Sequence, residues 1–193
     1  SVKQNIEGYD RLVQKSLEVE GIVAATPFIY YEVMLSTPSG VKGVVLRGID
    51  PRTAGTVLSV EKDLVSGSLS DLAGPGDTPG IVIGKELASR LGLTIGSRVS
   101  LLAPSGKKSA AGFSPRIVFF NVVGMFHSGM YEYDSSLAFV AIPEAQKILG
   151  FEGDFVTGIE YRVADIDAVQ GTGEALVRAL GGFPLYARNW IEM

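Results

Sequence analysis

Apolar positions along the first fifty residues predict one helix followed by a two-stranded hairpin. Residues 2–20 carry apolar side chains at helical spacing, and Gly21 follows where a helix C-terminus favours glycine. Residues 22–35 are dense in Val, Ile, Tyr and Phe and predict a long strand, in which Pro27 marks an edge, a bend or a bulge. Residues 41–49 return as a second strand after a turn. This opening is typical of an α+β protein.

The rest of the chain predicts short strands that alternate with short helices. The pattern weakens over residues 52–70, interpreted as mixed helix and loop, and residues 72–80 form a Gly/Pro-rich connector. The elements expected after it are strands at 81–83, 98–103, 117–126, 137–142, 157–163 and 183–187, and helices at 84–91, 143–149 and 165–180. The last helix is expected to start from an N-cap at Asp165 and to bury Ile166, Val169, Leu176 and Val177.

A tract of small and polar residues separates the strands at 98–103 and 117–126. Residues 104–115 read Pro-Ser-Gly-Lys-Lys-Ser-Ala-Ala-Gly-Phe-Ser-Pro and cannot build a core. Two strands that flank a dozen such residues predict a hairpin with an unusually long tip, and loops of this length tend to be functional or disordered. The tip holds Lys107, Lys108 and Phe113. We predict that this protrusion grips a partner.

Charge sets the same tract apart from the rest of the chain. The formal net charge is −4, from 17 basic and 21 acidic residues, and an acidic protein is poorly suited to bind nucleic acid. Residues 104–116 contain three basic residues, the third being Arg116, and no acidic one. Such a contrast can steer an acidic partner, or the lysines simply keep a loop soluble.

Composition excludes several classes of protein and site. Hydrophobic residues make up 46% of the 193 positions and charged residues 20%, which is typical of a globular chain with a sizeable core. No cysteine is present, so disulfides, thiol nucleophiles and cysteine metal sites are excluded. No apolar run approaches the ~20 residues that span a bilayer, and no signal peptide is found. A chain that begins at Ser1 and ends at Met193 is expected to be excised from a longer protein.

Two short constellations raise the question of catalysis or metal binding. His127, the single histidine, lies beside Ser128 and near Asp134, but a hydrolase needs these groups to converge in a pocket, and no nucleophile-elbow pattern is present. His127 is therefore interpreted as a residue at a strand end. Glu132 and Asp134 could hold a cation, although neighbouring carboxylates more often cap turns. No phosphate-loop pattern accompanies the glycines of residues 72–80.

Several motifs resemble one family of membrane transporters. Residues 82–101 read VIGKELASRLGLTIGSRVSL and resemble the signature of the periplasmic core domain in MacB/FtsX-type ABC transporter permeases. Residues 119–126 (FFNVVGMF) and 128–140 (SGMYEYDSSLAFV) are similar to the lipoprotein-releasing permeases of the LolC/LolE type. GIEYRVADID at 158–167 and ARNW at 187–190 continue the likeness, which covers nearly the whole chain.

The resemblance implies an α+β fold, a MacB-like periplasmic core domain with mixed sheets, packed helices and a protruding β-hairpin. The domain would span residues 1–193, with residues 61–155 as an inserted sub-lobe that carries the hairpin 98–126. It would lie between the first two transmembrane helices of a permease, on the periplasmic face of the Gram-negative inner membrane. It would be non-catalytic and without cofactor, since a separate cytoplasmic ATPase subunit hydrolyses ATP.

The resemblance also implies partners and contact residues. Lipoprotein cargo would be extracted from the membrane and passed to a LolA-like periplasmic carrier, and a second permease subunit would complete the transporter. The carrier would be docked by a hook comprising Pro104, Ser105, Gly106, Lys107, Lys108, Gly112, Phe113 and Pro115. A supporting pad would include Arg98, Ser100 and Arg116. Met130, Tyr131 and Tyr133 would contact cargo or another subunit, unless they pack in the core.

Two alternatives stay open. One is a core domain of a MacB-like efflux permease or an FtsX-like signalling permease, which would bind a different periplasmic partner. The other is an autonomous enzyme. A long protruding hairpin favours the carrier-docking domain, a groove without a hook favours the first alternative, and a pocket with convergent titratable groups favours the second.

Overall fold

The computed structural model describes residues 6–74, 76–103, 107–109, 112–114, 116–150, 154–182 and 185–189, and the side chains of residues 104–115 lie outside this description. The strands are β1 Ile6–Glu7, β2 Ile22–Thr37, β3 Gly40–Ile49, β4 Leu64–Ser66, β5 Gly80–Gly84, β6 Arg98–Leu102, β7 Lys107–Ser109, β8 Gly112–Ser114, β9 Ile117–Phe126, β10 Leu137–Ala141, β11 Phe155–Val156 and β12 Gly158–Val163. The helices are α1 Tyr9–Ser16, α2 Ala54–Val57, α3 Lys85–Leu91, α4 Tyr131–Ser136, α5 Ile142–Leu149 and α6 Val169–Ala179, with a 3₁₀ helix, η1, at Leu69–Ala73.

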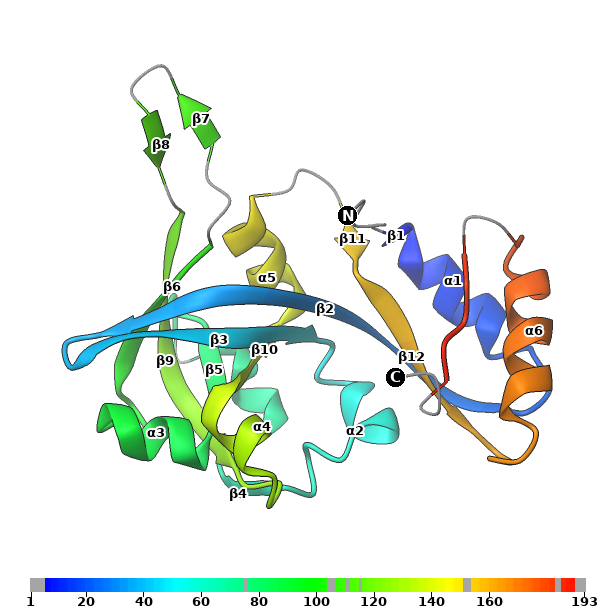
Figure 1. Cartoon of the computed structure of the whole chain (residues 1–193), viewed down its shortest axis with the longest axis horizontal. Coiled ribbons are helices and arrows are strands. Elements are labelled where there is room, and N and C mark those ends of the chain that lie inside the picture. The colour runs from blue at the N-terminus through cyan, green and yellow to red at the C-terminus, as the bar shows by residue number, and fades with distance from the viewer. Residues whose placement is uncertain are drawn as a thin grey trace.

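Six of these strands close into a barrel (Figure 1). The ring runs β2–β3–β10–β5–β9–β6 and returns to β2, because β2 pairs with β3 over residues 28–37 and with β6 through Met34–Ser36. The β3–β10 and β5–β9 pairs are parallel and the other four are antiparallel, so the sheet is mixed. The predicted α+β class with mixed sheets and packed helices is confirmed.

The barrel interior is the main core, and strand alternation selects its residues. Every second side chain of each strand points inward. The inward-facing set is buried and comprises Val33, Leu35, Val44, Leu46, Ile81, Ile83, Val99, Leu101, Phe120, Val122, Ala138 and Val140. Leu87 of α3 and Ile148 of α5 pack into the same cluster.

A second apolar cluster covers part of the barrel's outer face. Outward-facing Ile49, Val82, Phe126 and Phe139 pack against residues from α2, η1 and the segment between them. The rings of Phe126 and Phe139 meet edge-on, with centroids 5.4 Å apart. These elements lie over β3, β5, β10 and the end of β9, whereas the outer face of β2, β6 and the start of β9 bears exposed apolar side chains.

The first half of β2 runs out of the barrel and carries a smaller helical layer (Figure 1). There β2 pairs with β12, α1 packs on β2, and α6 lies beside α1. Pro27 pairs with Ile159 of β12, one residue before the β3 pairing begins at Phe28. The missing N–H of Pro27 therefore costs no bond to β3, which explains how a proline fits in this long strand.

The structure corrects several expected boundaries. The last helix starts at Val169, and Asp165 accepts a bond from the Asp167 N–H in the turn before it rather than capping the helix. Ile166 is 59% exposed, and Leu176 is the one member of its expected apolar set that is fully buried. Residues 185–187, where a last strand was expected, belong to no strand, while residues 183–184 lie outside the described part of the chain.

The first helix is also shorter than expected, and α4 was not predicted. The apolar spacing over residues 2–20 predicted a longer helix. In the structure α1 ends at Ser16, and the residues after it form a turn that leads into β2. The inserted sub-lobe at residues 61–155 stays a prediction; within it, β10 pairs with β3 of the preceding segment. In the described part of the chain, none of the helices has the length and apolarity needed to cross a bilayer.

Gly48 marks a close approach between α5 and the barrel wall. A Cβ atom at this position would meet the Cβ of Ala145 at 2.8 Å and the Cβ of Ile29 at 3.1 Å. We expect Gly48→Ala to destabilise the fold by about 1–3 kcal/mol, because α5 must shift away from the sheet. Gly43→Ala on the same strand is the control, since nothing lies within 4 Å of its added Cβ. Urea unfolding measures both, and equal stability of the two variants would contradict this packing.

Candidate partner-docking site

A two-stranded ribbon extends the barrel at the predicted protrusion. β7 and β8 pair antiparallel, with Lys107 opposite Ser114, Lys108 opposite Phe113 and Ser109 opposite Gly112. Figure 1 shows this ribbon standing away from the barrel, at the ends of β6 and β9. The expected hairpin is therefore present, and residues 107–109 and 112–114 of its predicted long tip form a strand ladder.

Only part of the predicted hook lies in the described chain. Lys107 and Lys108 lie on β7, and Gly112 and Phe113 lie on β8. The remaining hook residues, Pro104, Ser105, Gly106 and Pro115, lie outside the described residues.

The base of the hairpin presents two of the three predicted pad residues on one face. Val99 and Leu101 point into the barrel, so Arg98 and Ser100, which alternate with them on β6, lie on its outer face. The guanidinium carbon of Arg98 lies 4.5 Å from the ring centroid of Phe119 on the neighbouring strand β9, a cation–π contact. The Ser100 hydroxyl donates to the carbonyl oxygen of Ser36 at 3.5 Å.

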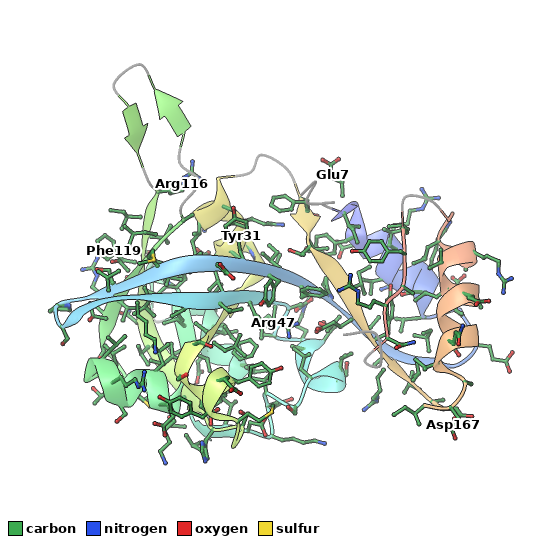
Figure 2. All side chains as sticks on the ribbon, viewed as in Figure 1. Glu7, Tyr31, Arg47, Arg116, Phe119 and Asp167 are labelled. Carbon is green, nitrogen blue, oxygen red and sulfur yellow. The ribbon has the colours of Figure 1, made fainter. Side chains whose placement is uncertain are left out.

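Arg116, the third predicted pad residue, contacts the C-terminal end of α5. Its Nη1 donates to the Lys147 carbonyl oxygen at 2.8 Å, in the last turn of α5, and its guanidinium lies next to Gly150. A cation at a helix C-terminus is favoured by the helix dipole and by the unpaired carbonyls there. Figure 2 shows Arg116 at the hairpin base beside α5, and Phe119 on the outer side of β9. The structure therefore separates Arg116 from Arg98 and Ser100.

The predicted cargo or subunit contacts lie in a different region. Met130 precedes α4, and Tyr131 and Tyr133 lie on it; all three side chains are about half exposed. Tyr131 receives a hydrogen bond from Arg90 of α3, whose guanidinium carbon lies 5.3 Å from the tyrosine ring centroid. Figure 1 shows α4 at the end of the barrel away from the hairpin, so these residues do not join the hook or the pad.

Asp134, which the sequence analysis placed near His127 and Ser128, is a buried polar centre in the structure. The side chain is 1% exposed, and its carboxylate accepts bonds from the Ser128 N–H and hydroxyl, both at 2.8 Å, and from the Gly129 N–H at 3.2 Å. His127 Nδ1 lies 2.8 Å from Asp134 Oδ2. Burial by itself raises the pKa of the Asp134 carboxyl, but the bonds from Ser128, His127 and Gly129 outweigh burial and lower the pKa below its usual range.

This arrangement is a structural tie and lacks the order of a hydrolase triad. In a triad the imidazole lies between the serine and the carboxylate. Here the carboxylate lies between Ser128 and His127, and it holds the turn of residues 127–130 against the start of α4. The described residues contain no group of three or more His, Cys, Asp or Glu side chains that could hold a metal ion.

Residues 3–179 match the family described as the MacB-like periplasmic core domain. The chain belongs to this family. It is 30% identical over 171 residues to the lipoprotein-releasing system transmembrane protein LolC of Neisseria meningitidis serogroup B, covering 89% of this chain and 40% of LolC. It is 23% identical over 192 residues to LolE of Haemophilus influenzae, covering 98% of this chain and 43% of LolE. The extracellular domain of the noncanonic ABC-type transporter YknZ superposes with a TM-score of 0.61 at 17% identity, covering 93% of this chain and 84% of that domain.

These findings confirm the predicted resemblance and the MacB-like fold. The chain spans about 40% of the length of the curated relatives it matches. MacB-like periplasmic core domains belong to ABC transporter permeases and are generally non-catalytic. Membership of this family supports a periplasmic location for the domain. The LolC and LolE relatives are named as transmembrane proteins of a lipoprotein-releasing system.

Removing the Asp134 carboxylate should destabilise this MacB-like domain. Asp134→Ala leaves the Ser128 and Gly129 N–H groups without their acceptor and should cost about 2–4 kcal/mol in the free energy of unfolding. Because the pKa of Asp134 is lowered by folding, its contribution is present above the unfolded value of about 3.9 and is lost as pH falls through the folded value.

Urea unfolding at pH 7 and at decreasing pH measures this contribution. The difference between wild type and Asp134→Ala should shrink as the pH drops below about 4. Glu132→Ala, at an exposed position on the same helix, is the control and should stay within about 0.5 kcal/mol of wild type. A wild-type-like stability of Asp134→Ala at pH 7 would show that the tie is unimportant.

Proposed function

We propose that this chain is the carrier-docking periplasmic domain of a LolC-type ABC transporter permease. The transporter extracts lipoproteins from the Gram-negative inner membrane and passes them to a LolA-like periplasmic carrier. The β7–β8 hairpin docks that carrier. A cytoplasmic ATPase subunit and a second permease subunit act with the domain through the full-length protein. The projecting ribbon β7–β8, at the ends of the barrel strands β6 and β9, is the observation that carries this proposal.

Physical reasons make a ribbon of this kind a suitable docking element. Its two strands are paired with each other, so entering a concave partner orders little additional backbone. Its strands follow β6 and precede β9 in the chain, and Leu102–Ile117 is the last pair of these two strands of the closed barrel. Lys107, Lys108 and Phe113 supply two positive charges and one aromatic ring, a combination that orients and anchors a bound protein.

The relatives favour this assignment over the neighbouring possibilities. LolC of Neisseria meningitidis is named for lipoprotein release and shares 30% identity along most of this chain. The similarity to YknZ, at 17% identity, supports the fold alone. A MacB-like efflux or FtsX-like signalling permease would share this barrel but would use a periplasmic partner other than the carrier.

Calorimetric titration of the 193-residue chain with the LolA-type carrier of the same genome tests the proposal. We expect a complex for the wild type and no measurable complex when residues 107–114 are replaced by a two-residue Asn-Gly turn. Phe113→Ala should weaken binding by about 2 kcal/mol, or roughly 30-fold, if the ring is a central anchor.

A matched pair of charge variants separates specific contact from general attraction. Lys107→Ala with Lys108→Ala removes two charges from the hairpin, and Lys15→Ala with Lys62→Ala removes two exposed charges from the body. The hairpin pair should weaken carrier binding by several-fold more than the body pair. Unchanged affinity after hairpin replacement would refute carrier docking by this element, and no binding by the intact domain would favour a different partner.

A further inference from the structure

The large sheet ends in an open edge at β12, on the far side of the molecule from the hairpin (Figure 1). β12 pairs with the first half of β2 on one side, and no strand of the described residues pairs with its other side. None of its residues is fully buried. Proteins commonly shield such an edge with a proline or a bulge. β12 contains no proline, and the extra residue at its irregular pairing, Val23, belongs to β2.

The ladder with β2 determines which backbone groups of β12 face outward. The Thr157 N–H donates to the Phe28 carbonyl oxygen at 2.9 Å, and the Tyr30 N–H donates to the Thr157 hydroxyl at 3.0 Å. At the other end, the Ala164 N–H donates to the Gly21 carbonyl oxygen at 2.9 Å. Backbone groups alternate in direction along an antiparallel strand. Even-numbered residues of β12 therefore bond to β2, and odd-numbered residues direct their N–H and C=O groups outward.

The outward-directed residues are Ile159, Tyr161 and Val163. Ile159 lies opposite Pro27, which has no N–H to donate, as expected for a pair that is not hydrogen-bonded. The outward groups recur at every second residue, which is the spacing that one more antiparallel strand would match. The edge of β12 is thus suited to the addition of a strand.

The charges of β12 favour a second copy of the same strand as the added one. In an antiparallel pair centred on Tyr161, Glu160 lies opposite Arg162 of the second copy, and Ile159 lies opposite Val163. Opposite charges across such a pair are stabilising. A centre at Glu160 or at Arg162 would place like charges opposite each other and would turn the outward backbone groups out of register. The sequence of this edge is therefore complementary to itself in one register.

The side chains around the edge are arranged for this contact. Arg162 is exposed and takes part in none of the ion pairs among the described residues. Glu160 is held by Arg47, whose Nη2 lies 2.6 Å from Glu160 Oε2, and its side chain remains 32% exposed. On the other face of β12, Tyr161 is hydrogen-bonded to Ser16 of α1. A fixed carboxylate on one copy would thus meet an unpaired guanidinium on the other.

We propose that β12 pairs antiparallel with β12 of a second copy of this chain, about a two-fold axis at Tyr161, so that the two large sheets become continuous. Such a contact uses the same surface on both copies. Main-chain hydrogen bonds supply its affinity, and the Glu160–Arg162 pairs fix its register. The contact buries less surface than a standard protein interface, so the free chain should dimerise weakly.

Sedimentation equilibrium of the 193-residue chain at concentrations up to about 1 mM tests the proposal, and we expect a dimer with a Kd on the order of 0.1–1 mM. Ile159→Pro removes an outward N–H and places a ring at the edge. Because proline is tolerated on an edge strand, this variant should keep the wild-type thermal unfolding and lose the dimer. Ile159→Ala keeps the N–H and should still dimerise.

A charge variant tests the register without altering the backbone. Arg162→Glu places two glutamates opposite each other and should weaken the dimer roughly ten-fold at about 0.05 M NaCl. The loss should shrink at about 0.5 M NaCl, because salt screens exposed charges. Arg178→Glu makes the same change at an exposed arginine of α6 and should dimerise like the wild type.

Two results would overturn the inference. A chain that stays monomeric at about 1 mM would leave the edge for an extended segment of a different protein. A dimer that survives both Ile159→Pro and Arg162→Glu would use another surface. Carrier binding is a separate readout, since Ile159→Pro should bind the LolA-type carrier like the wild type. If the chain dimerises through β12 but binds no carrier, the self-pairing stands and the proposed function fails.

Discussion

The pairing of β2 with two partners at once is the constraint on which the rest of the structure depends. Residues Met34–Ser36 bond to β3 on one side and to β6 on the other, and this contact turns an open mixed sheet into a closed ring. Closure removes two sheet edges and encloses the core that Leu35, Leu101 and Phe120 fill. It also fixes β6 against β2, so both strands that lead to the hairpin, β6 and β9, are members of the closed ring.

The closed barrel divides its outer wall into a covered part and a bare part. α2 and η1 bury the outward-facing residues of β5 and β10, while the face of β2, β6 and β9 below the hairpin keeps Ile117 and Phe119 in contact with solvent. The Asp134 tie lies at the far end of the barrel and fixes the turn that leads into α4. The Asp134 tie and the proposed docking hairpin thus lie at opposite ends of one scaffold.

Local sequence was a good guide where the signal is carried by a strand's own residues. The β-branched and aromatic content of residues 22–35 and 117–126 predicted β2 and β9, and the small-residue tract between two strands predicted the hairpin. The predicted start and buried face of the last helix were wrong, because the side chains there make contacts that their own sequence positions do not specify. Asp165 is a good helix N-cap residue, yet it bonds within the preceding turn, and Ile166 fits a helical stripe that the fold leaves exposed.

The sequence by itself determined the class of the protein, because motif order, strand alternation and the basic tract are all properties of neighbouring residues. Only the tertiary structure decided which residues share a surface. Arg98, Ser100 and Arg116 flank the same tract in the sequence, but Arg116 is held by a carbonyl of α5. Met34 comes from a distant segment and pairs with Leu102, which in turn pairs with Ile117. Barrel closure and helix placement depend on long-range packing, which no local pattern encodes.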